Sequence, residues 1–566
     1  MGPTIGIDLG TTNSLIAVFE GGAPRLLPNA LGNLLTPSVV GLDDNGTLVV
    51  GETAKRRLVS HPDQTHALFK RQMGTNRLHR LGRKDYRAED LSALVLRTLK
   101  ADAEEALGQV ITEAVVSVPA YFNETQRRAV HNACALAGMK ATRLINEPTA
   151  AALAYGLQDR EDESTFLVFD LGGGTFDVSI LEMFEGVMEV KSTAGDAFLG
   201  GEDFTDTLAK HLGEALKPPL AKTTHEHKAQ LRTAADAAKL ALSSAHETTV
   251  SLSIGDSNLD QTVTRDTFEE INKPTLARLR KPVERALHDA NLRIADLDRV
   301  VLVGGATRMP VVRSLIARQL QRLPEGTIDP DHVVALGAAV QAGLAARDAA
   351  LEDVVMTDVS AFTLGIETTR ESNGTYHHGF YLPVIERNST VPISREEVVH
   401  SLVPGQKSLT IAVYQGEAPM VVDNVKLGQF ELAIPYNPKE TESAAIRFTY
   451  DVSGLLEVEG RSLSTGKSTS IVIQSTGGTL SDREIKARLK QLESLKVHPR
   501  DQAENQHMLA RLGEAYAMAR GAERDYIQNQ LARFQTLIEQ QDDSEIAEAM
   551  TELDQFLTSF EQNYVR

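Results

Sequence analysis

The chain has 566 residues, 42% of them hydrophobic and 24% charged, and it carries a formal net charge of −19. A chain of this length is too long for one hydrophobic core, so about three to five domains or subdomains are expected. The acidic balance argues against sequence-independent binding to nucleic acid, and the single cysteine, Cys134, excludes an intrachain disulfide and a cysteine-based metal cluster.

Residues 1–350 alternate short apolar strand signals with helical segments, which predicts a mixed α/β domain built on central sheets. The strand signals are IGIDLG, AVVSVPA, TFLVFDLG and VVLVGGA, and the helical signals are TQRRAVHNACALAG, TLAKHLGEAL and KAQLRTAADAAKLAL. Cys134 falls on the apolar face of the first of these helices, so we predict a buried structural thiol.

Two similar turns follow two of these strands: DLGTTNS begins at Asp8 and DLGGGTFD begins at Asp170. In the second turn, three consecutive glycines permit a sharp bend and let main-chain N–H groups approach an anion closely. Either turn alone is equally well explained as an ordinary tight hairpin, because glycine-rich loops are weak signals. The repetition favours two half-domains that face each other and bring both aspartates to one cleft. Carboxylates beside phosphates indicate a divalent cation such as Mg²⁺.

Two further glycine turns extend this nucleotide-binding pattern. In VLVGGATRMP a strand signal runs into Gly304 and Gly305 and then into a helical signal, and Arg308 is available to contact a base or sugar. LGGEDF, at 199–204, supplies another turn of the same kind. The pattern GxxxxGK[ST] does not occur in the sequence, which excludes a P-loop enzyme.

The sequence pattern changes twice after residue 350. The segment 351–358, LEDVVMTD, is predicted to be an interdomain linker with no element of its own. Residues 359–478 contain alternating strand signals separated by turn residues, which predicts an antiparallel β-sandwich. Residues 479–566 regain helical spacing after a capping box, Ser481 to Glu484, which predicts a small helical bundle.

Six ordered motifs resemble those of the 70-kDa heat-shock chaperone family, the DnaK type: IGIDLGTTNS, VPAYFNETQRRA, INEPTAAALAYG, DLGGGTFDVSIL, GDAFLGGEDF and VLVGGATRMP. The resemblance covers essentially the whole chain and is greatest for the shorter bacterial HscC-type members. It implies that residues 1–350 are an actin-like ATPase domain, with ATP between two lobes built on duplicated ribonuclease-H-like cores. It also implies that the β-sandwich binds peptides and that the helical end is a lid.

The resemblance further implies roles for residues of the ATPase cleft. Asp8 and Asp170 would hold hydrated Mg²⁺ and K⁺ ions, and Lys70 would position the attacking water and stabilise charge on the γ-phosphoryl group. Such roles suit phosphoryl transfer, which needs positioning and charge stabilisation more than covalent help. Glu147, Asp177 and Thr175 would complete the catalytic network. The phosphates and adenosine of ATP or ADP would contact Gly10, Thr11, Thr12, Asn13, Gly172, Gly173, Gly174, Thr175, Gly200, Gly201, Asp236, Lys239, Ser243, Gly304, Gly305 and Arg308.

For the β-sandwich, the resemblance implies capture and ATP-controlled release of extended hydrophobic segments of unfolded client proteins. The expected pocket residues are Leu364, Ile366, Val399, Leu409 and Ile411, and Thr369 and Leu402 would close an arch over the peptide. Each apolar residue in this set is about equally well explained as sandwich core. Pro119, Arg127, Arg143 and Asp358 would couple the domains.

The resemblance implies a role in protein folding and the stress response, with a J-domain co-chaperone that would meet Arg143 and the 354–358 segment. Whether a nucleotide exchange factor is needed stays open, because the turn in TVSLSIGDSNLDQTVTR is short where such factors bind. The sequence has no apolar run long enough to cross a bilayer and no recognisable secretory signal, so we expect a cytoplasmic protein that uses neither membrane nor nucleic acid.

Three other classes of protein would share an actin-like core. A small-molecule kinase would need a polar substrate pocket in the cleft and would have no use for a β-sandwich. A filament-forming actin relative would lack residues 359–566 altogether. A non-hydrolysing exchange factor would not need the intact set Lys70, Glu147, Asp170 and Thr175. The β unit is therefore the feature that discriminates among these classes.

Overall fold

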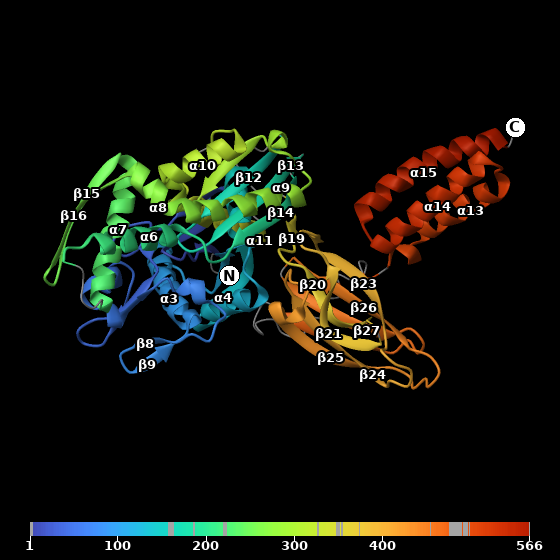
Figure 1. The fold of residues 1–566 in the computed structure, drawn as a ribbon, viewed down its shortest axis with the longest axis horizontal. Coiled ribbons are helices and arrows are strands. Elements are labelled where there is room, and N and C mark those ends of the chain that lie inside the picture. The colour runs from blue at the N-terminus through green and yellow to red at the C-terminus, as the bar shows by residue number, and fades with distance from the viewer. Residues whose placement is uncertain are drawn as a thin grey trace.

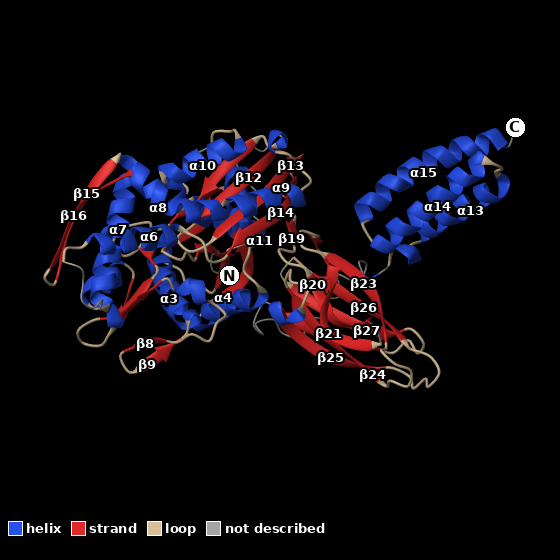
Figure 2. Ribbon diagram, in the orientation of Figure 1, coloured by secondary structure: helices blue, strands red, loops and turns tan. Residues whose placement is uncertain are grey.

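The computed structural model describes residues 4–156, 163–184, 187–218, 224–324, 328–346, 351, 355–372, 374–452, 454–474, 490, 496 and 498–564. These residues form a mixed α/β unit, a unit of two β-sheets and a helical unit, in chain order (Figures 1 and 2). The β unit lies beside the α/β unit, and the helical unit projects away at the C-terminal end (Figure 1). The predicted capping box, Ser481 to Glu484, lies outside the described residues.

The first sheet of the α/β unit contains the first DLG turn. Strands β1 (Ile5–Asp8), β2 (Asn13–Glu20) and β3 (Ala23–Leu26) form an antiparallel meander, and β10 (Glu113–Val118) and β11 (Lys140–Asn146) continue the sheet in parallel beside β1. The strands read as nearly continuous apolar runs because helices cover both faces of the sheet.

The second sheet repeats this order around the second DLG turn. Strands β12 (Ser164–Leu171), β13 (Phe176–Phe184) and β14 (Val187–Asp196) form the meander, and β17 (Arg299–Val303) runs parallel to β12. The two DLG turns therefore occupy the same position in two sheets of similar order, as the sequence repeat predicts.

Helices α5 (Glu147–Gly156) and α11 (Val333–Ala345) pack against each other between the two sheets. Their small side chains allow a very close approach. A Cβ atom on Gly337 would lie 1.7 Å from the carbonyl oxygen of Ala150 on the facing helix.

The remaining helices of the α/β unit cover the outer faces of its sheets. Helices α3 (Ala88–Leu107) and α4 (Glu124–Leu136) pack on the first sheet, and Cys134 on α4 is fully buried, as predicted. The second sheet is covered by α6 (Gly201–Ala215), α7 (His225–Ser244), α8 (Arg265–Arg278), α9 (Arg280–Asp289) and α10 (Pro310–Leu320). Smaller elements are β4 (Thr36–Pro37), β5 (Val39–Leu42), β6 (Leu48–Val50), α1 (Glu52–Lys55), α2 (Arg57–Ser60), η1 (Pro62–Gln64), β7 (Thr65–Ala67), η2 (Phe69–Gln72), β8 (His79–Leu81), β9 (Lys84–Tyr86), β15 (Glu247–Ile254), β16 (Ser257–Thr264), η3 (Ile294–Asp296) and η4 (Gly305–Arg308).

The β unit consists of two four-stranded antiparallel sheets that enclose one apolar core, as the alternating sequence pattern predicts. The first sheet contains, in spatial order, β21 (Thr375–Ile385), β20 (Leu364–Ser372), β24 (Ser408–Gln415) and β25 (Val425–Ala433). The second contains β23 (Ile393–His400), β26 (Ser443–Tyr450), β27 (Leu455–Ser462) and β28 (Ser468–Gln474).

The prediction that segment 351–358 forms no element is wrong. Strand β18 (Val355–Met356) adds to the second α/β sheet as a parallel neighbour of β14, and β19 (Asp358–Val359) pairs with β22 (Thr390–Val391) of the β unit. Strands of two residues carry no periodicity that a sequence pattern could reveal. Pairing with strands of both units fixes where the chain crosses between them.

The helical unit consists of α13 (Ala503–Met518), α14 (Ala522–Gln540) and α15 (Asp543–Tyr564), which share one apolar core. One contact with the β unit is made at Glu396, on the edge strand β23. The Gln541 side chain donates to the Glu396 carbonyl oxygen at 2.8 Å and accepts from its N–H at 3.1 Å, and the Arg500 guanidinium lies 3.0 Å from the Glu396 carboxylate. These contacts cover part of an otherwise open sheet edge.

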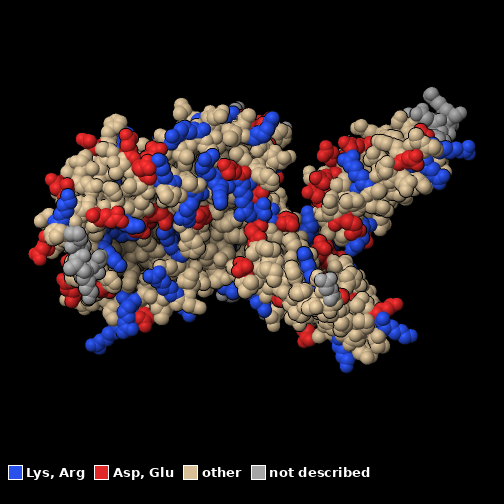
Figure 3. Space-filling model, viewed as in Figure 1, with Lys and Arg blue, Asp and Glu red and all other residues tan. Residues whose placement is uncertain are grey.

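Acidic and basic side chains are interspersed over the face of the α/β unit seen in Figure 3. Within the part of the chain that the structure describes, no helix is both long and apolar enough to span a membrane.

The contact between α5 and α11 generates a stability prediction. Gly337→Ala should lower the free energy of unfolding by about 3 kcal/mol, because the added methyl group must displace the backbone of α5. Gly213→Ala on α6 is the matched control: its Cβ would meet only Leu231, at 3.4 Å, so the substitution should raise stability by about 0.5–1 kcal/mol. Urea denaturation measures both, and equal stabilisation by the two substitutions would contradict the packing described.

Candidate nucleotide site and interdomain contacts

The two DLG turns are in direct contact: glycines of the second turn pack against threonines of the first. A Cβ atom on Gly173 would lie 1.9 Å from the hydroxyl oxygen of Thr12, and one on Gly174 would lie 2.7 Å from that of Thr11. Any larger residue would force the turns apart. The glycines therefore let main-chain amides and threonine hydroxyls converge on one small region, which suits a phosphate group.

Two other predicted glycine turns pack against the DLGGGTFD turn. A Cβ atom on Gly304 would lie 2.4 Å from the carbonyl oxygen of Leu171, and one on Gly200 would lie 2.4 Å from that of Gly173. The Gly201 N–H donates to the Gly172 carbonyl at 2.9 Å, which ties the start of α6 to the turn. The predicted phosphate-binding turns are thus neighbours in space.

The predicted catalytic side chains lie beside these turns. Asp170 and Asp177 face each other across the β12–β13 ladder, and both are almost fully buried. The Lys70 ammonium, on η2, donates to the Glu147 carboxylate at 2.7 Å, and both side chains are buried. The hydroxyl of Ser117 donates to the Asp8 carboxylate at 2.7 Å. Several carboxylates therefore share one interior region with a single lysine.

Burial of these carboxylates changes their protonation. Desolvation is the main cause that raises the pKa of Asp8 to about 7 and that of Asp177 to about 8, and the nearby Glu147 charge adds to both shifts. The pKa of Asp170 is also raised well above its usual range, by desolvation first and then by neighbouring carboxylates. The carboxyl groups thus lack enough positive charge around them to ionise together.

The same carboxylates fit a bound cation. One carboxylate oxygen of Asp170 and one of Asp177 are buried without a hydrogen-bond partner. Within the described part of the chain, no group of three or more His, Cys, Asp or Glu side chains is arranged to hold a metal ion directly. Mg²⁺ usually keeps several water ligands and binds with substrate phosphates, so one or two carboxylates at the end of a phosphate site fit its requirements.

The residues predicted to contact adenosine lie on α7 and η4. The Lys239 ammonium donates to the hydroxyl of Thr205 at 2.7 Å and lies 2.8 Å from the Asp236 carboxylate, which fixes α7 against α6. Ser243 follows one turn later on α7. Arg308 lies with acidic residues that sequence reasoning did not identify: its guanidinium donates to Asp331 and Asp329.

Two of the predicted coupling residues, Arg127 and Arg143, act on a third, Asp358, where the linker enters the β unit. The Asn146 amide donates to both carboxylate oxygens of Asp358, at 3.1 and 3.2 Å, and its own carbonyl accepts from Arg127 at 2.6 Å. Burial raises the pKa of Asp358 and lowers that of Arg143, and the attraction between the two charges opposes both shifts. Pro119 follows β10 directly. Asn146, which binds Asp358, and Glu147, which binds Lys70, are consecutive residues, so the two contacts are separated by a single peptide bond.

The predicted peptide-binding residues are divided between the core and one end of the β unit. The apolar set, Leu364, Ile366, Leu409 and Ile411, is buried in the core, and Val399 is half-buried against it. The two predicted arch residues have other partners. Thr369 is hydrogen-bonded to the His378 ring at 2.8 Å, and the Leu402 carbonyl accepts from the Tyr376 hydroxyl at 3.3 Å.

Several residues of the site carry no sequence signal of their own. Ser117 and Tyr121, whose N–H donates to the Asp177 carboxylate at 3.0 Å, act through contacts between distant segments. Asn146 could have been identified by its position beside Glu147. Arg71, which follows Lys70, reaches the second DLG turn and was not predicted.

A comparison with protein-family models identifies the class of protein that these turns and units define. The family model described as Hsp70 protein matches residues 4–566, so the chain belongs to the Hsp70 family. Proteins of this family are ATP-dependent chaperones that bind nucleotide with Mg²⁺, unfolded client polypeptides and co-chaperones. The closer resemblance to HscC-type members remains a prediction.

The contact between Lys70 and Glu147 leads to a catalytic prediction. Lys70→Ala should bind ATP but hydrolyse it about 10²–10³-fold more slowly in a single turnover, because the buried donor that stabilises transition-state charge is lost. Calorimetric ADP binding checks that the variant is folded. A near wild-type single-turnover rate would rule out this role for Lys70.

The pKa of Asp177 leads to a pH prediction for the nucleotide-free, chelator-treated protein. The pKa of Asp177 is about 8 in the folded protein, against an ordinary value of 3.8. At pH values between these two, Asp177 keeps its proton in the folded state and has lost it in the unfolded state. Stability should therefore fall as pH rises through this window. Asp177→Asn should give a flatter plot of Tm against pH between about pH 6 and 8. Parallel plots for the two proteins would show that Asp177 does not titrate in this way.

Proposed function

We propose that this chain is an ATP-hydrolysing chaperone in which nucleotide controls the capture and release of extended hydrophobic client segments. Residues 1–350 would be an actin-like ATPase domain of duplicated ribonuclease-H-like halves, 351–358 the linker, 359–478 the peptide-binding β-sandwich and 479–566 the lid. The observation that carries the proposal is the direct contact of two equivalent turns beside buried carboxylates and one lysine.

The chain's own groups would act on ATP by positioning and charge stabilisation. Main-chain amides of the two turns and the hydroxyls of Thr11, Thr12 and Thr175 would bind the phosphates. Lys70, oriented by Glu147, would hold the attacking water and stabilise charge on the γ-phosphoryl group. Mg²⁺, when bound, would neutralise the charge that develops on the phosphate oxygens.

The buried carboxylates would serve the ions and the water. Asp8 and Asp170 would hold Mg²⁺ through its water ligands, and K⁺ would share the site. Asp177, fixed by the Tyr121 N–H, would accept a hydrogen bond from the water network. The adenosine would lie between α7, with Asp236, Lys239 and Ser243, and the turn that carries Arg308.

Communication with the β unit would pass through Asn146 and Glu147. A change in the position of Glu147 on hydrolysis moves its neighbour Asn146, and Asn146 binds Asp358 at the entry to the β unit. Arg127, which donates to both Asn146 and the Phe122 carbonyl, ties the same point to the segment after Pro119. Two discrete arrangements of this contact would give the reciprocal coupling that the proposal requires.

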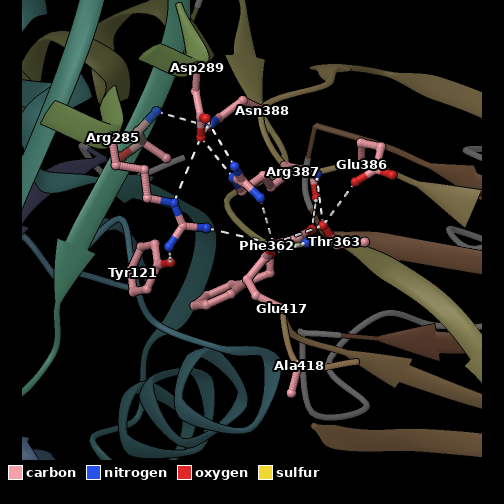
Figure 4. A network of polar contacts seen from close by, with 12 residues as sticks. Tyr121, Arg285, Asp289, Phe362, Thr363, Glu386, Arg387, Asn388, Glu417 and Ala418 are labelled. Carbon is pink, nitrogen blue, oxygen red and sulfur yellow. Dashed lines mark hydrogen bonds and ion pairs between the residues drawn. The ribbon is translucent and has the colours of Figure 1, made fainter. Parts of the chain in front are cut away.

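A polar network beside this point supports a docked state of the two units (Figure 4). The Arg387 guanidinium, from the β unit, binds both carboxylate oxygens of Asp289 on α9, at 2.7 and 2.9 Å. Burial alone would raise the pKa of Asp289, but the hydrogen bonds from Arg387 and His288, together with the charges of Arg387 and Arg285, lower it overall. Tyr121 packs on the ring of Phe362, with centroids 4.5 Å apart. The Arg387 side chain is 31% exposed and that of Asp289 only 7%, so solvent screens this ion pair only in part.

Extended peptides would bind where Val399, Thr369 and Leu402 lie at the end of the β unit, in the mode that combines main-chain hydrogen bonds with a side-chain pocket. A J-domain partner would meet Arg143 and the linker.

A peptide-stimulated ATPase assay tests the proposal. An unfolded peptide, rather than a sugar, should accelerate ATP hydrolysis by the wild-type protein. Asp358→Asn should retain the basal rate and lose most of the stimulation, because its neutral amide no longer attracts Arg143 and Arg127. Asp256→Asn, an exposed residue in the β15–β16 turn at the opposite end of the molecule, is the matched control (Figure 1). Stimulation by sugars and not by peptides would favour the kinase class instead.

A further inference from the structure

Arg71 follows Lys70 on the one-turn helix η2, and the two side chains reach different parts of the site. Lys70 binds Glu147, whereas the Nε–H of Arg71 donates to the carbonyl oxygen of Gly174 at 3.0 Å. The second arm of the Arg71 guanidinium binds the carboxylate of Asp203 in the first turn of α6. One short helix therefore places two cations at the cleft.

The partners of Arg71 belong to the half of the unit that contains the second sheet. The Asp203 carboxylate also accepts from the N–H of Gly200, which precedes α6. Arg71 and Asp203 retain only 17% and 24% of their side-chain exposure, so solvent screens the pair weakly. The guanidinium thus joins the segment that carries Lys70 to both the DLGGGTFD turn and the start of α6.

The bond from Arg71 determines which way a peptide group of the turn faces. In a trans peptide the C=O of one residue and the N–H of the next point in opposite directions. With the Gly174 carbonyl turned toward Arg71, the N–H of Thr175 must point away from Arg71. No side chain on Gly174 intervenes, since a Cβ there would lie 3.0 Å from Arg71 Nε. Without this bond, a glycine peptide group is among the easiest in the chain to rotate.

We propose that Arg71 is a positioning residue for ATP hydrolysis: it fixes the Gly174–Thr175 peptide group and holds the DLGGGTFD turn at a set distance from Lys70. The inference rests on the proposed function of the cleft. Because Arg71 and Lys70 are adjacent on η2, the same helix that carries the catalytic cation also holds the turn on which the phosphates would lie.

The chemistry requires arginine at this position. A guanidinium presents N–H donors in a rigid planar fork, so one side chain can bind a carbonyl oxygen and a carboxylate in different directions. A lysine ammonium keeps the charge but has no fixed second direction. Arg71→Lys therefore separates the positioning effect from the electrostatic effect of the charge.

The matched control is Arg278→Lys. The Arg278 guanidinium also binds one carboxylate, that of Asp196 at 2.7 Å, and one main-chain carbonyl, that of Phe198 at 3.1 Å. All three residues lie in the half that contains the second sheet, so this substitution removes the same kind of contact without releasing Lys70 from the turn.

Two measurements test the proposal. Arg71→Lys should slow single-turnover ATP hydrolysis by about 10–100-fold, the effect of one charge-assisted hydrogen bond, and should change the KM for ATP by less than about threefold. In the nucleotide-free protein, amide hydrogen exchange of residues 171–177 should accelerate by about tenfold, because the turn is no longer held. Arg278→Lys should leave the hydrolysis rate and this exchange at wild-type values.

Each other outcome overturns the proposal. Wild-type hydrolysis by Arg71→Lys, or an equal loss in Arg278→Lys, would make the contact merely structural. Unchanged exchange in residues 171–177 would show that Arg71 does not hold the turn. If the wild-type protein itself fails to hydrolyse ATP, the proposed function fails, and the exchange measurement still decides whether Arg71 orders the turn.

Discussion

The structure depends on one electrostatic constraint: several carboxyl groups are buried beside a single ammonium group. Asp8, Asp170 and Asp177 have raised pKa values because burial removes water and the Glu147 charge disfavours a further ionised carboxylate, and Lys70 offsets only part of this effect. Such a cluster is costly unless a cation and phosphate-binding groups complete it. The contact between the two turns, which requires glycine at Gly173 and Gly174, brings the main-chain amides and threonine hydroxyls of both turns into one region.

Glu147, which belongs to the carboxylate cluster, also connects the cleft to the β unit. Strand β11 ends at Asn146 and helix α5 begins at Glu147. Glu147, which orients Lys70, is therefore the next residue in the chain after Asn146, which binds Asp358. Around this point the linker pairs with strands of both units, and partly exposed ion pairs such as Arg387–Asp289 hold the units together. Contacts of this kind define the docked arrangement of the two units.

Much of this arrangement could be predicted from local sequence patterns. The duplicated hairpins, the glycine turns, the alternating strands after residue 359 and the buried Cys134 follow from periodicity and turn chemistry. The strand at Val355 could not be predicted, because two residues have no period. The hydrogen-bond partners of Arg308, Thr369 and Leu402 could not be predicted either, because each partner lies on a different segment of the chain.

The sequence by itself determined the repeat of the DLG turns, the order of the three units and membership of the Hsp70 family, because these properties lie in contiguous motifs. Only the tertiary structure decided that Arg71 reaches the carbonyl of Gly174, that Asn146 binds Asp358 and that the helical unit contacts the edge of β23. The physical reason is that hydrogen bonds between residues more than a hundred positions apart leave no periodic trace. They depend on how closely two packed halves approach, and that distance is set by the whole core.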